Sequence, residues 1–287
     1  MSAALRNSFL PDEQTIARLR ERAQFVRLET IRLIEIAKVG HYSSVFSAAE
    51  IFAALYYDVM TLSADPKWPD RDRFLMGKGH AAVGLFPILA DKGYLPVEVL
   101  NGYTRLGNPL GDHPDMRKVP GIDFSSGSIG HALSNGLGMA LAGRFQGKGF
   151  TTFVMLGDGE MQEGQVWEAA LGAAHHKLGR LVAIVDRNGF QLDGAVDDVL
   201  GVEPLDDKWR AFGWEVHVVD GHDLSELTAA LRQAKADTGR TRPCCIIAKT
   251  LKGKGVSYME TEPGWHLGYL DPADAEAARA EILSKVI

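Results

Sequence analysis

The sequence is poor in cysteine: its 287 residues include only two, Cys244 and Cys245, which are adjacent in a strand-like run. Neighbouring strand residues point their side chains to opposite faces, so an ordinary disulfide between these two is excluded and both are predicted to lie in the core. The chain also lacks a secretory-type beginning and an apolar run long enough to span a bilayer. These absences predict a cytoplasmic protein with no membrane role.

An excess of positive charge is missing as well. Lysine and arginine number 31 against 37 aspartates and glutamates, which gives a formal net charge of −6. A nucleic-acid partner is therefore disfavoured, because proteins that bind nucleic acid carry a basic surface. A content of 46% hydrophobic and 24% charged residues is typical of a globular chain. We expect residues 1–287 to form one α/β domain, in which N-terminal helices precede a doubly wound, mainly parallel sheet of about five or six strands flanked by helices.

The stretch from Thr151 to Asp193 is the most informative part of the chain, and it reads as strand, sharp turn, helix and strand. Thr151 to Leu156 is rich in β-formers, and Gly157-Asp158-Gly159 breaks this run where a parallel strand would leave its sheet. Apolar residues at helical spacing follow, with Gly179 as the predicted left-handed C-terminal cap, and Leu181 to Asp186 reads as the next strand. Such a βαβ unit brings both strand ends to the same edge of the sheet.

Two oxygen-bearing side chains, Asp158 and Asn188, fall at that edge, which is where open α/β sheets bind ligands. Together with a backbone carbonyl near Phe190 they match the few oxygen ligands of Mg²⁺, which completes its shell with phosphate oxygens and water. Gly157 and Gly159 would let the backbone approach a phosphate closely, because neither carries a Cβ. The alternative interpretation is a pair of ordinary turns, Gly-Asp-Gly and Asn-Gly.

The pattern GDG, about thirty residues, then N resembles the thiamine diphosphate motif. The longer string, GDGEMQEG followed by E, KLG, L, AI, D, NG and DG, is similar to transketolase specifically. The resemblance covers nearly the whole chain and implies the thiamine diphosphate-binding fold. It also implies thiamine diphosphate and Mg²⁺, or another divalent cation such as Ca²⁺ or Mn²⁺, as cofactors.

Four histidines occupy positions that the resemblance marks as functional. His41 lies in GHYSSVFSAAEIFAALY, which resembles the substrate channel, and His80 lies in KGHA, which resembles a turn that reaches the diphosphate and the reacting centre. His113, in HPD, would face the donor sugar, and His266, in GWHLG, would close over the diphosphate. Taken alone, His41 and His80 read equally well as surface or helix-start residues. The four are the predicted catalytic residues, since imidazoles donate, accept or shuttle protons near neutral pH.

The segment SSGSIGHALSNGLGMALAGR resembles another cofactor-contacting region of the family. By that correspondence Gly127 and Ile129 line the cofactor, and Glu163, which matches a family acid near the subunit interface, joins the predicted cofactor contacts. An exposed helix face is the alternative for Glu163. The chain departs from the family pattern at four positions: Ser43, Ser44, Ser128 and His131.

The remaining elements are predicted from periodicity and punctuation. A helix over residues 15–39 should end at a Gly40 cap, and Ser47 with Glu50 forms a capping box that begins the next helix after a tight link over 41–46. The segment 107–128 reads as a long functional loop. Lys252 and Lys254 lie among glycines, in either a solvated or a phosphate-contacting loop. Further strands and helices are expected at Arg73–Met76, Trp214–Val219, Leu224–Ala236, Pro243–Lys249 and Pro272–Val286.

The resemblance implies the N-terminal subunit of a split transketolase. A separate C-terminal subunit would supply the pyrimidine-binding domain in a heterotetramer, and a two-carbon ketol unit would pass from a ketose to an aldose, as sugar phosphates or sulfosugars. Two alternatives are another thiamine diphosphate enzyme, such as a 2-oxo acid dehydrogenase alpha subunit, and a non-catalytic cofactor-binding subunit. The segments GHYSS and HPD favour transketolase over the dehydrogenase.

Overall fold

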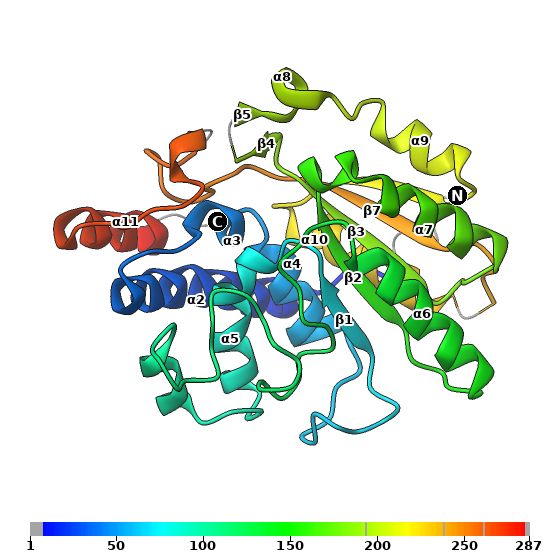
Figure 1. The fold of residues 1–287 in the computed structure, drawn as a ribbon, viewed down its shortest axis with the longest axis horizontal. Helices are drawn as coiled ribbons and strands as arrows, with labels where there is room; N and C mark the ends of the chain where they lie inside the picture. The colour runs from blue at the N-terminus through cyan, green and yellow to red at the C-terminus, as the bar shows by residue number, and fades with distance from the viewer. Residues whose placement is uncertain (1–7, 193, 238, 261, 285–287) are drawn as a thin grey trace.

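A five-stranded parallel sheet forms the centre of the molecule, with its strands in the order β1-β2-β3-β7-β6 (Figure 1). The computed structural model describes residues 8–192, 194–237, 239–260 and 262–284. The observed sheet confirms the predicted α/β class. Its strands are β1 (Arg73–Met76), β2 (Thr152–Gly157), β3 (Leu181–Arg187), β6 (Glu215–Asp220) and β7 (Cys244–Lys249).

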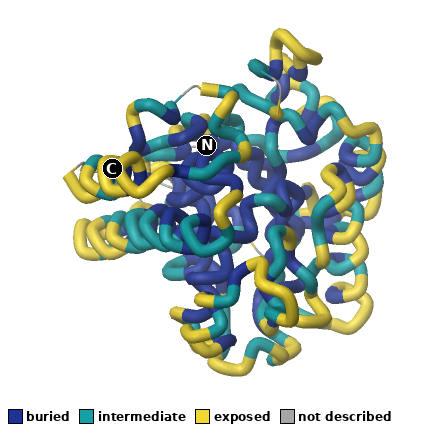
Figure 2. Tube along the Cα trace, turned by 60° about the vertical axis from the view of Figure 1, so that its left-hand side comes forward, coloured by how far each residue is buried: buried dark blue, intermediate teal, exposed yellow. Residues whose placement is uncertain are grey.

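Helices cover both faces of this sheet. On one face, α2, α4, α5, α10 and α11 share a hydrophobic core with alternate strand residues, and on the other face α6, α7 and α9 do so. Figure 2 shows the buried chain concentrated in the interior, with exposed segments at the periphery. The helices are α2 (Glu13–Ala37), α3 (Tyr42–Phe46), α4 (Ala49–Ala54), α5 (Ala82–Asp91), α6 (Ala132–Phe145), α7 (Gly164–His175), α8 (Val196–Leu200), α9 (Leu205–Ala211), α10 (Leu224–Ala236) and α11 (Pro272–Ser284).

The central strands are buried on both faces, which explains why they read as nearly continuous apolar runs. In β7, Cys244 belongs to the core under α10 and Cys245 to the core on the opposite face. Both thiols are free and buried, as the sequence predicted. A short antiparallel pair, β4 (Phe190–Gln191) with β5 (Gly194–Ala195), follows β3.

The predicted glycine caps are wrong, although the helices end close to where they were expected. The left-handed residue after α2 is Lys38, with φ of 65°, and the one after α7 is Lys177, with φ of 53°. The glycines serve close packing instead. A Cβ on Gly40 would lie 2.5 Å from the Ile34 side chain, and one on Gly179 would lie 1.6 Å from the Arg240 carbonyl oxygen.

The predicted capping box is also wrong. Helix α4 begins after Ala48, without a side-chain cap, and the supposed link before it contains the helix α3. The Ser47 hydroxyl donates to Asp186, while Glu50 is bound by Arg27, so both side chains are used for contacts between distant segments. Local capping preference lost here to buried tertiary partners.

Other predicted elements agree with the structure. Strand β1 and helix α10 have the predicted bounds, and residues 107–128 contain no helix or strand. The last helix begins at Pro272 as expected and is described to Ser284, so its predicted end at Val286 lies outside the described residues. No helix within the described ranges has the length and apolar content needed to cross a bilayer.

Two glycines of α6 allow a matched test of packing. An added Cβ at the buried Gly136 would lie 2.5 Å from Cγ2 of Val154 on β2, whereas one at the exposed Gly138 would meet nothing within 4 Å. We expect Gly136→Ala to lower the free energy of unfolding by about 1–3 kcal/mol through overpacking. Gly138→Ala should raise it by about 0.5–1 kcal/mol through helix propensity. Denaturant unfolding of the isolated chain measures both, and equal effects would contradict the packing argument.

Candidate active site at the carboxyl ends of the strands

Four strand ends meet around a cavity of about 270 Å³. Parallel strands bring their carboxyl ends to one edge, so the residues that follow β1, β2, β3 and β7 gather there. The lining combines cationic, acidic, amide and imidazole side chains with glycine backbone. Its residues are Ser44, Lys78, His80, Ile129, Gly157, Asp158, Gly159, Glu160, Gln162, Glu163, Asn188, Phe190, Gln191, Leu192, Lys252 and His266.

The three predicted metal-ligand positions all lie in this lining. The carboxylate of Asp158 is buried and accepts hydrogen bonds from the backbone N–H groups of Gly159, at 2.9 Å, and Gly189, at 2.6 Å. The amide oxygen of Asn188 accepts from the Phe190 N–H at 3.0 Å. Burial, with a smaller contribution from nearby Asp186, raises the pKa of Asp158 to about 6, so a cation beside it would be stabilising.

The oxygen atoms at these positions form part of a shell for a hard cation. Among the described residues, no cluster of three or more histidines, cysteines, aspartates or glutamates is arranged to hold a metal. One carboxylate, one amide oxygen and the nearby backbone are instead a partial oxygen shell, which suits Mg²⁺ when phosphate and water complete it. The residues present therefore fit a metal that arrives together with a phosphate-bearing ligand.

The four predicted histidines form one cluster. The ring centroid of His41 lies 5.0 Å from that of His80, 5.3 Å from that of His266 and 6.5 Å from that of His113, while His80 and His266 are 5.2 Å apart. His80 and His266 line the cavity itself. The structure thus brings together side chains from four segments that are far apart in the sequence.

Two of these imidazoles are neutral at neutral pH. Burial, followed by the nearby Lys78 ammonium, lowers the pKa of His80 well below its ordinary value. Burial and then Lys252 lower the pKa of His266 to about 4. Each ring can therefore donate one hydrogen bond and accept another, which suits the binding of hydroxyl groups.

Two buried lysines add positive charge to the cavity; sequence reasoning missed Lys78 and does not decide the role of Lys252. Lys78 forms an ion pair with Asp186, with both side chains buried. Lys252 is only 1% exposed, and its Nζ has no hydrogen-bond partner. Burial and then the charge of Lys78 lower the pKa of Lys252 to about 8, which shows that its charge is incompletely compensated. An anion in the cavity would compensate it.

Lys254 does not line this cavity. Its carbonyl oxygen instead accepts a hydrogen bond from Nε of Arg27 at 3.0 Å, on the side of α2. The structure therefore separates the two lysines, which sequence reasoning treats together, because the turn between them points their side chains to different surroundings.

Two acids were also missed. Glu160, buried, accepts backbone hydrogen bonds from Gly130 at 2.7 Å and Gly157 at 3.1 Å, and burial raises its pKa to about 7. It thereby fixes the loop that carries Ile129 to the end of β2. Asp112 has one carboxylate oxygen 3.5 Å from Nδ1 of His41 and the other 3.5 Å from Nδ1 of His113. Their positions beside predicted motif residues were the available signal.

The remaining predicted contacts lie around the rim. Ile129 is 36% exposed and lines the cavity, as does the exposed Glu163. Gly127 lies against His113, whose ring would be 3.6 Å from an added Cβ. Of the four departures from the family pattern, Ser44 is in the lining, Ser43 is buried, and Ser128 and His131 are exposed.

A parallel sheet with a buried, unpartnered lysine, neutral imidazoles and partial oxygen ligands around one cavity defines a domain built to bind an anionic cofactor. Residues 19–283 match the family described as transketolase, thiamine diphosphate binding domain. The chain therefore belongs to the transketolase family, as the sequence motifs predicted.

Two similar relatives are named as parts of two-subunit transketolases. The chain is 41% identical over 265 residues to the 6-deoxy-6-sulfo-D-fructose transketolase subunit SqwG of Clostridium sp. (strain MSTE9), with 92% of this chain and 96% of that protein covered. It is 39% identical over 259 residues to one subunit of the apulose-4-phosphate transketolase of Phocaeicola vulgatus, covering 89% and 91%.

Single-chain relatives are matched over less than half of their length. The transketolase of Rattus norvegicus is 38% identical over 278 residues, which covers 96% of this chain and 44% of that protein. The solved transketolase from Leishmania mexicana superposes with a TM-score of 0.86 at 29% identity, covering 93% of this chain and 41% of that chain.

The shifted pKa of Lys252 predicts a pH dependence for anion binding. Its ammonium must be charged to bind an anion, and its pKa in the ligand-free protein is about 8. Affinity for inorganic pyrophosphate should therefore stay high below pH 8 and fall as the pH rises above it. Calorimetric titrations across this range provide the measurement.

Two variants serve as controls for this dependence. Lys252→Met should weaken binding by about 10–100-fold, the value of a charge-assisted hydrogen bond, and should remove the decline except for titration of the probe itself. Lys254→Met should behave like the unaltered protein, because Lys254 lies outside the lining. An unchanged profile in Lys252→Met would show that another group binds the anion.

Proposed function

We propose that this chain is the N-terminal, thiamine diphosphate- and metal-binding subunit of a two-subunit transketolase. The enzyme would transfer a two-carbon ketol unit from a ketose to an aldose. The observation that carries the proposal is the single cavity at the strand ends, where Asp158 and Asn188 lie with the unpartnered Lys252 and next to four clustered histidines.

The residues divide into two groups toward the cofactor. Asp158, Asn188 and the Phe190 carbonyl would hold Mg²⁺, and Lys252, His80 and His266 would face the diphosphate together with the backbone of Gly157 and Gly159. Gly127, Ile129 and Glu163 would line its remaining surface. When bound, thiamine diphosphate supplies the electron sink for carbon–carbon bond cleavage. The protein supplies charge compensation and orientation around it.

The histidine cluster would bind the donor sugar. His41 and His113 extend the cluster beyond the cavity lining, and Asp112 lies between their Nδ1 atoms. Neutral imidazoles beside a buried cation can accept protons from sugar hydroxyls and return them, because each ring carries both a donor and an acceptor. All four histidines are accordingly proposed as catalytic residues.

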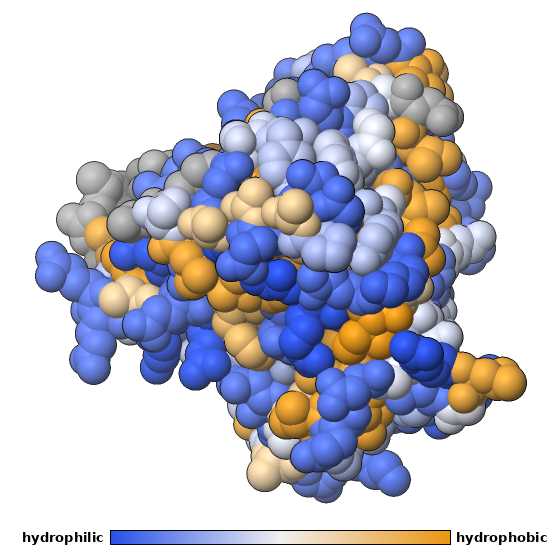
Figure 3. Space-filling model, turned by 90° about the vertical axis from the view of Figure 1, so that its left-hand side faces the viewer, coloured by the Kyte–Doolittle hydropathy of each residue, from blue (hydrophilic) through white to orange (hydrophobic). Residues whose placement is uncertain are grey.

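A separate C-terminal subunit would complete the site. Ile129 and Leu192 line the cavity, yet they are 36% and 60% exposed. Figure 3 shows apolar side chains also reaching the surface among hydrophilic ones on the face that it views. Exposed apolar walls at a cavity mouth are suited to cover by a partner. We propose that this partner is a pyrimidine-binding subunit, and that the two form a heterotetramer.

The names of the relatives guide the proposed substrates. One is named for 6-deoxy-6-sulfo-D-fructose and another for apulose-4-phosphate, both sugars with an anionic group. We propose a phosphorylated or sulfonated sugar for this chain too. Membership of the transketolase family disfavours the 2-oxo acid dehydrogenase alternative, and a cytoplasmic location stays a prediction.

Removal of the only carboxylate among the proposed metal ligands tests the motif assignment. Asp158→Ala should lower Mg²⁺-dependent thiamine diphosphate affinity by more than about 100-fold, since even loss of a residue that only orients a metal ligand costs about 10–100-fold. Asn188→Ala should act in the same direction but less strongly. Calorimetry with the partnered protein measures both, with the exposed Asp198→Ala of α8 as control. Unchanged affinity in folded Asp158→Ala would refute the assignment.

The need for a partner is tested by reconstitution. The purified chain with thiamine diphosphate and Mg²⁺ should show no ketol transfer, because its cavity mouth is open and the cofactor would stay hydrated. Addition of a candidate pyrimidine-domain protein should produce activity that saturates at one partner per chain. Full activity of the single chain would instead defeat the two-subunit proposal.

A further inference from the structure

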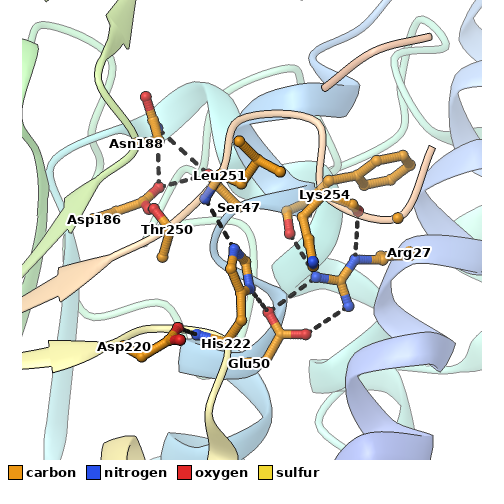
Figure 4. Close-up of polar contacts among 12 residues, drawn as sticks. Arg27, Ser47, Glu50, Asp186, Asn188, Asp220, His222, Thr250, Leu251 and Lys254 are labelled. Atoms are coloured by element: carbon orange, nitrogen blue, oxygen red, sulfur yellow. Dashed lines mark hydrogen bonds and ion pairs between the residues drawn. The ribbon is translucent and has the colours of Figure 1, made fainter. Parts of the chain in front are cut away.

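A buried trio of charged and polar side chains, Arg27, Glu50 and His222, lies behind the candidate site (Figure 4). Arg27 on α2 donates to both carboxylate oxygens of Glu50 on α4, at 2.7 and 2.9 Å, and both side chains are fully buried. His222, after β6, has Nδ1 2.9 Å from Glu50. Burial alone would raise the pKa of Glu50, but Arg27 and His222 lower it to about 2. The trio is thus a fully compensated charge cluster.

The hydrogen bonds of His222 determine its tautomer. Nε2 accepts from the backbone N–H of Leu251 at 2.8 Å, so this nitrogen carries no proton. Nδ1 must then carry the proton and donate it to Glu50. Figure 4 shows the ring between the Glu50 carboxylate and the Leu251 backbone. The imidazole therefore connects the buried ion pair to the loop that follows β7.

The trio holds that loop on both sides of Lys252. The Leu251 N–H before it is bound by His222, and the Lys254 carbonyl after it accepts from Nε of Arg27 at 3.0 Å. Between them, Gly253 has φ of 78°, and a Cβ there would lie 2.3 Å from the Met259 carbonyl oxygen. The backbone around Lys252 therefore has little freedom, and its unpartnered ammonium is presented to the cavity.

We infer that Arg27, Glu50 and His222 are positioning residues, which hold the backbone on both sides of Lys252 so that its ammonium faces the bound diphosphate. This inference rests on the proposed function, because Lys252 needs an anion in the cavity. A purely stabilising role would be an inefficient use of these groups, since a buried ion pair is often replaced by apolar residues without loss of stability. None of the three lines the cavity.

The test measures thiamine diphosphate affinity by calorimetry in the two-subunit protein with Mg²⁺. His222→Leu should weaken binding by about tenfold, the value of a lost orienting hydrogen bond. The same substitution should have no further effect in a Lys252→Met background, because the trio acts through Lys252. His217→Leu is the matched control: it removes a His–Glu contact of 2.9 Å on β6, away from the loop.

A second readout needs no cofactor. Amide hydrogen exchange at residues 251–254 should be faster in His222→Leu than in the unaltered protein and unchanged in His217→Leu. Should His222→Leu fail to fold, His222→Asn gives the same test, since its shorter amide can still donate to Glu50 but does not reach Leu251. The expected loss of affinity and its disappearance in the Lys252→Met background are then the same.

The outcomes separate the inference from the proposed function. Normal cofactor affinity in both His222 variants, or an equal loss of affinity with and without Lys252, would overturn the positioning role alone. No binding of thiamine diphosphate to the unaltered two-subunit protein would overturn the proposed function, and the positioning role with it. Faster exchange together with a loss that depends on Lys252 would support the inference.

Discussion

The buried carboxylate of Asp186 at the end of β3 is the interaction on which the candidate site depends. It forms an ion pair with Lys78 after β1 and accepts hydrogen bonds from Ser47, between α3 and α4, and from Thr250 after β7. Although burial acts to raise its pKa, Lys78 and these hydrogen bonds hold the pKa of Asp186 below its ordinary value. Loss of one charged partner would leave an uncompensated buried charge, at a cost of about 3–5 kcal/mol. Three loops are therefore fixed relative to one another.

This arrangement leaves charges at the cavity that are not yet compensated. The pKa of Lys252 is lowered and that of Asp158 is raised, in both cases chiefly by burial. An anion would stabilise the first group and a cation the second, so a metal–diphosphate ligand would meet both requirements at once. Because the histidines beside them are neutral, the site can bind hydroxyl groups without adding further positive charge.

Most of the fold could be predicted, because the strands and longer helices carry strong periodic patterns. The details that failed were all local preferences overruled by tertiary contacts. The sequence predicts caps at Gly40 and Gly179, yet these glycines are required where backbone or side chains of other segments approach closely. It predicts a helix cap at Ser47, yet that hydroxyl is bound to Asp186 across the site. Such contacts have no signature in a short window of sequence.

The sequence by itself determined the family, the order of strands and helices, and the positions of Asp158, Asn188 and the four histidines. It did so because these residues follow glycine-rich turns at strand ends, and the parallel topology brings such turns to one edge. Only the tertiary structure decided that Lys252 faces the cavity while Lys254 does not, and that Glu160 and Asp112 support the site. Burial and partner identity assign those roles, and both depend on segments that the chain brings together only when it is folded.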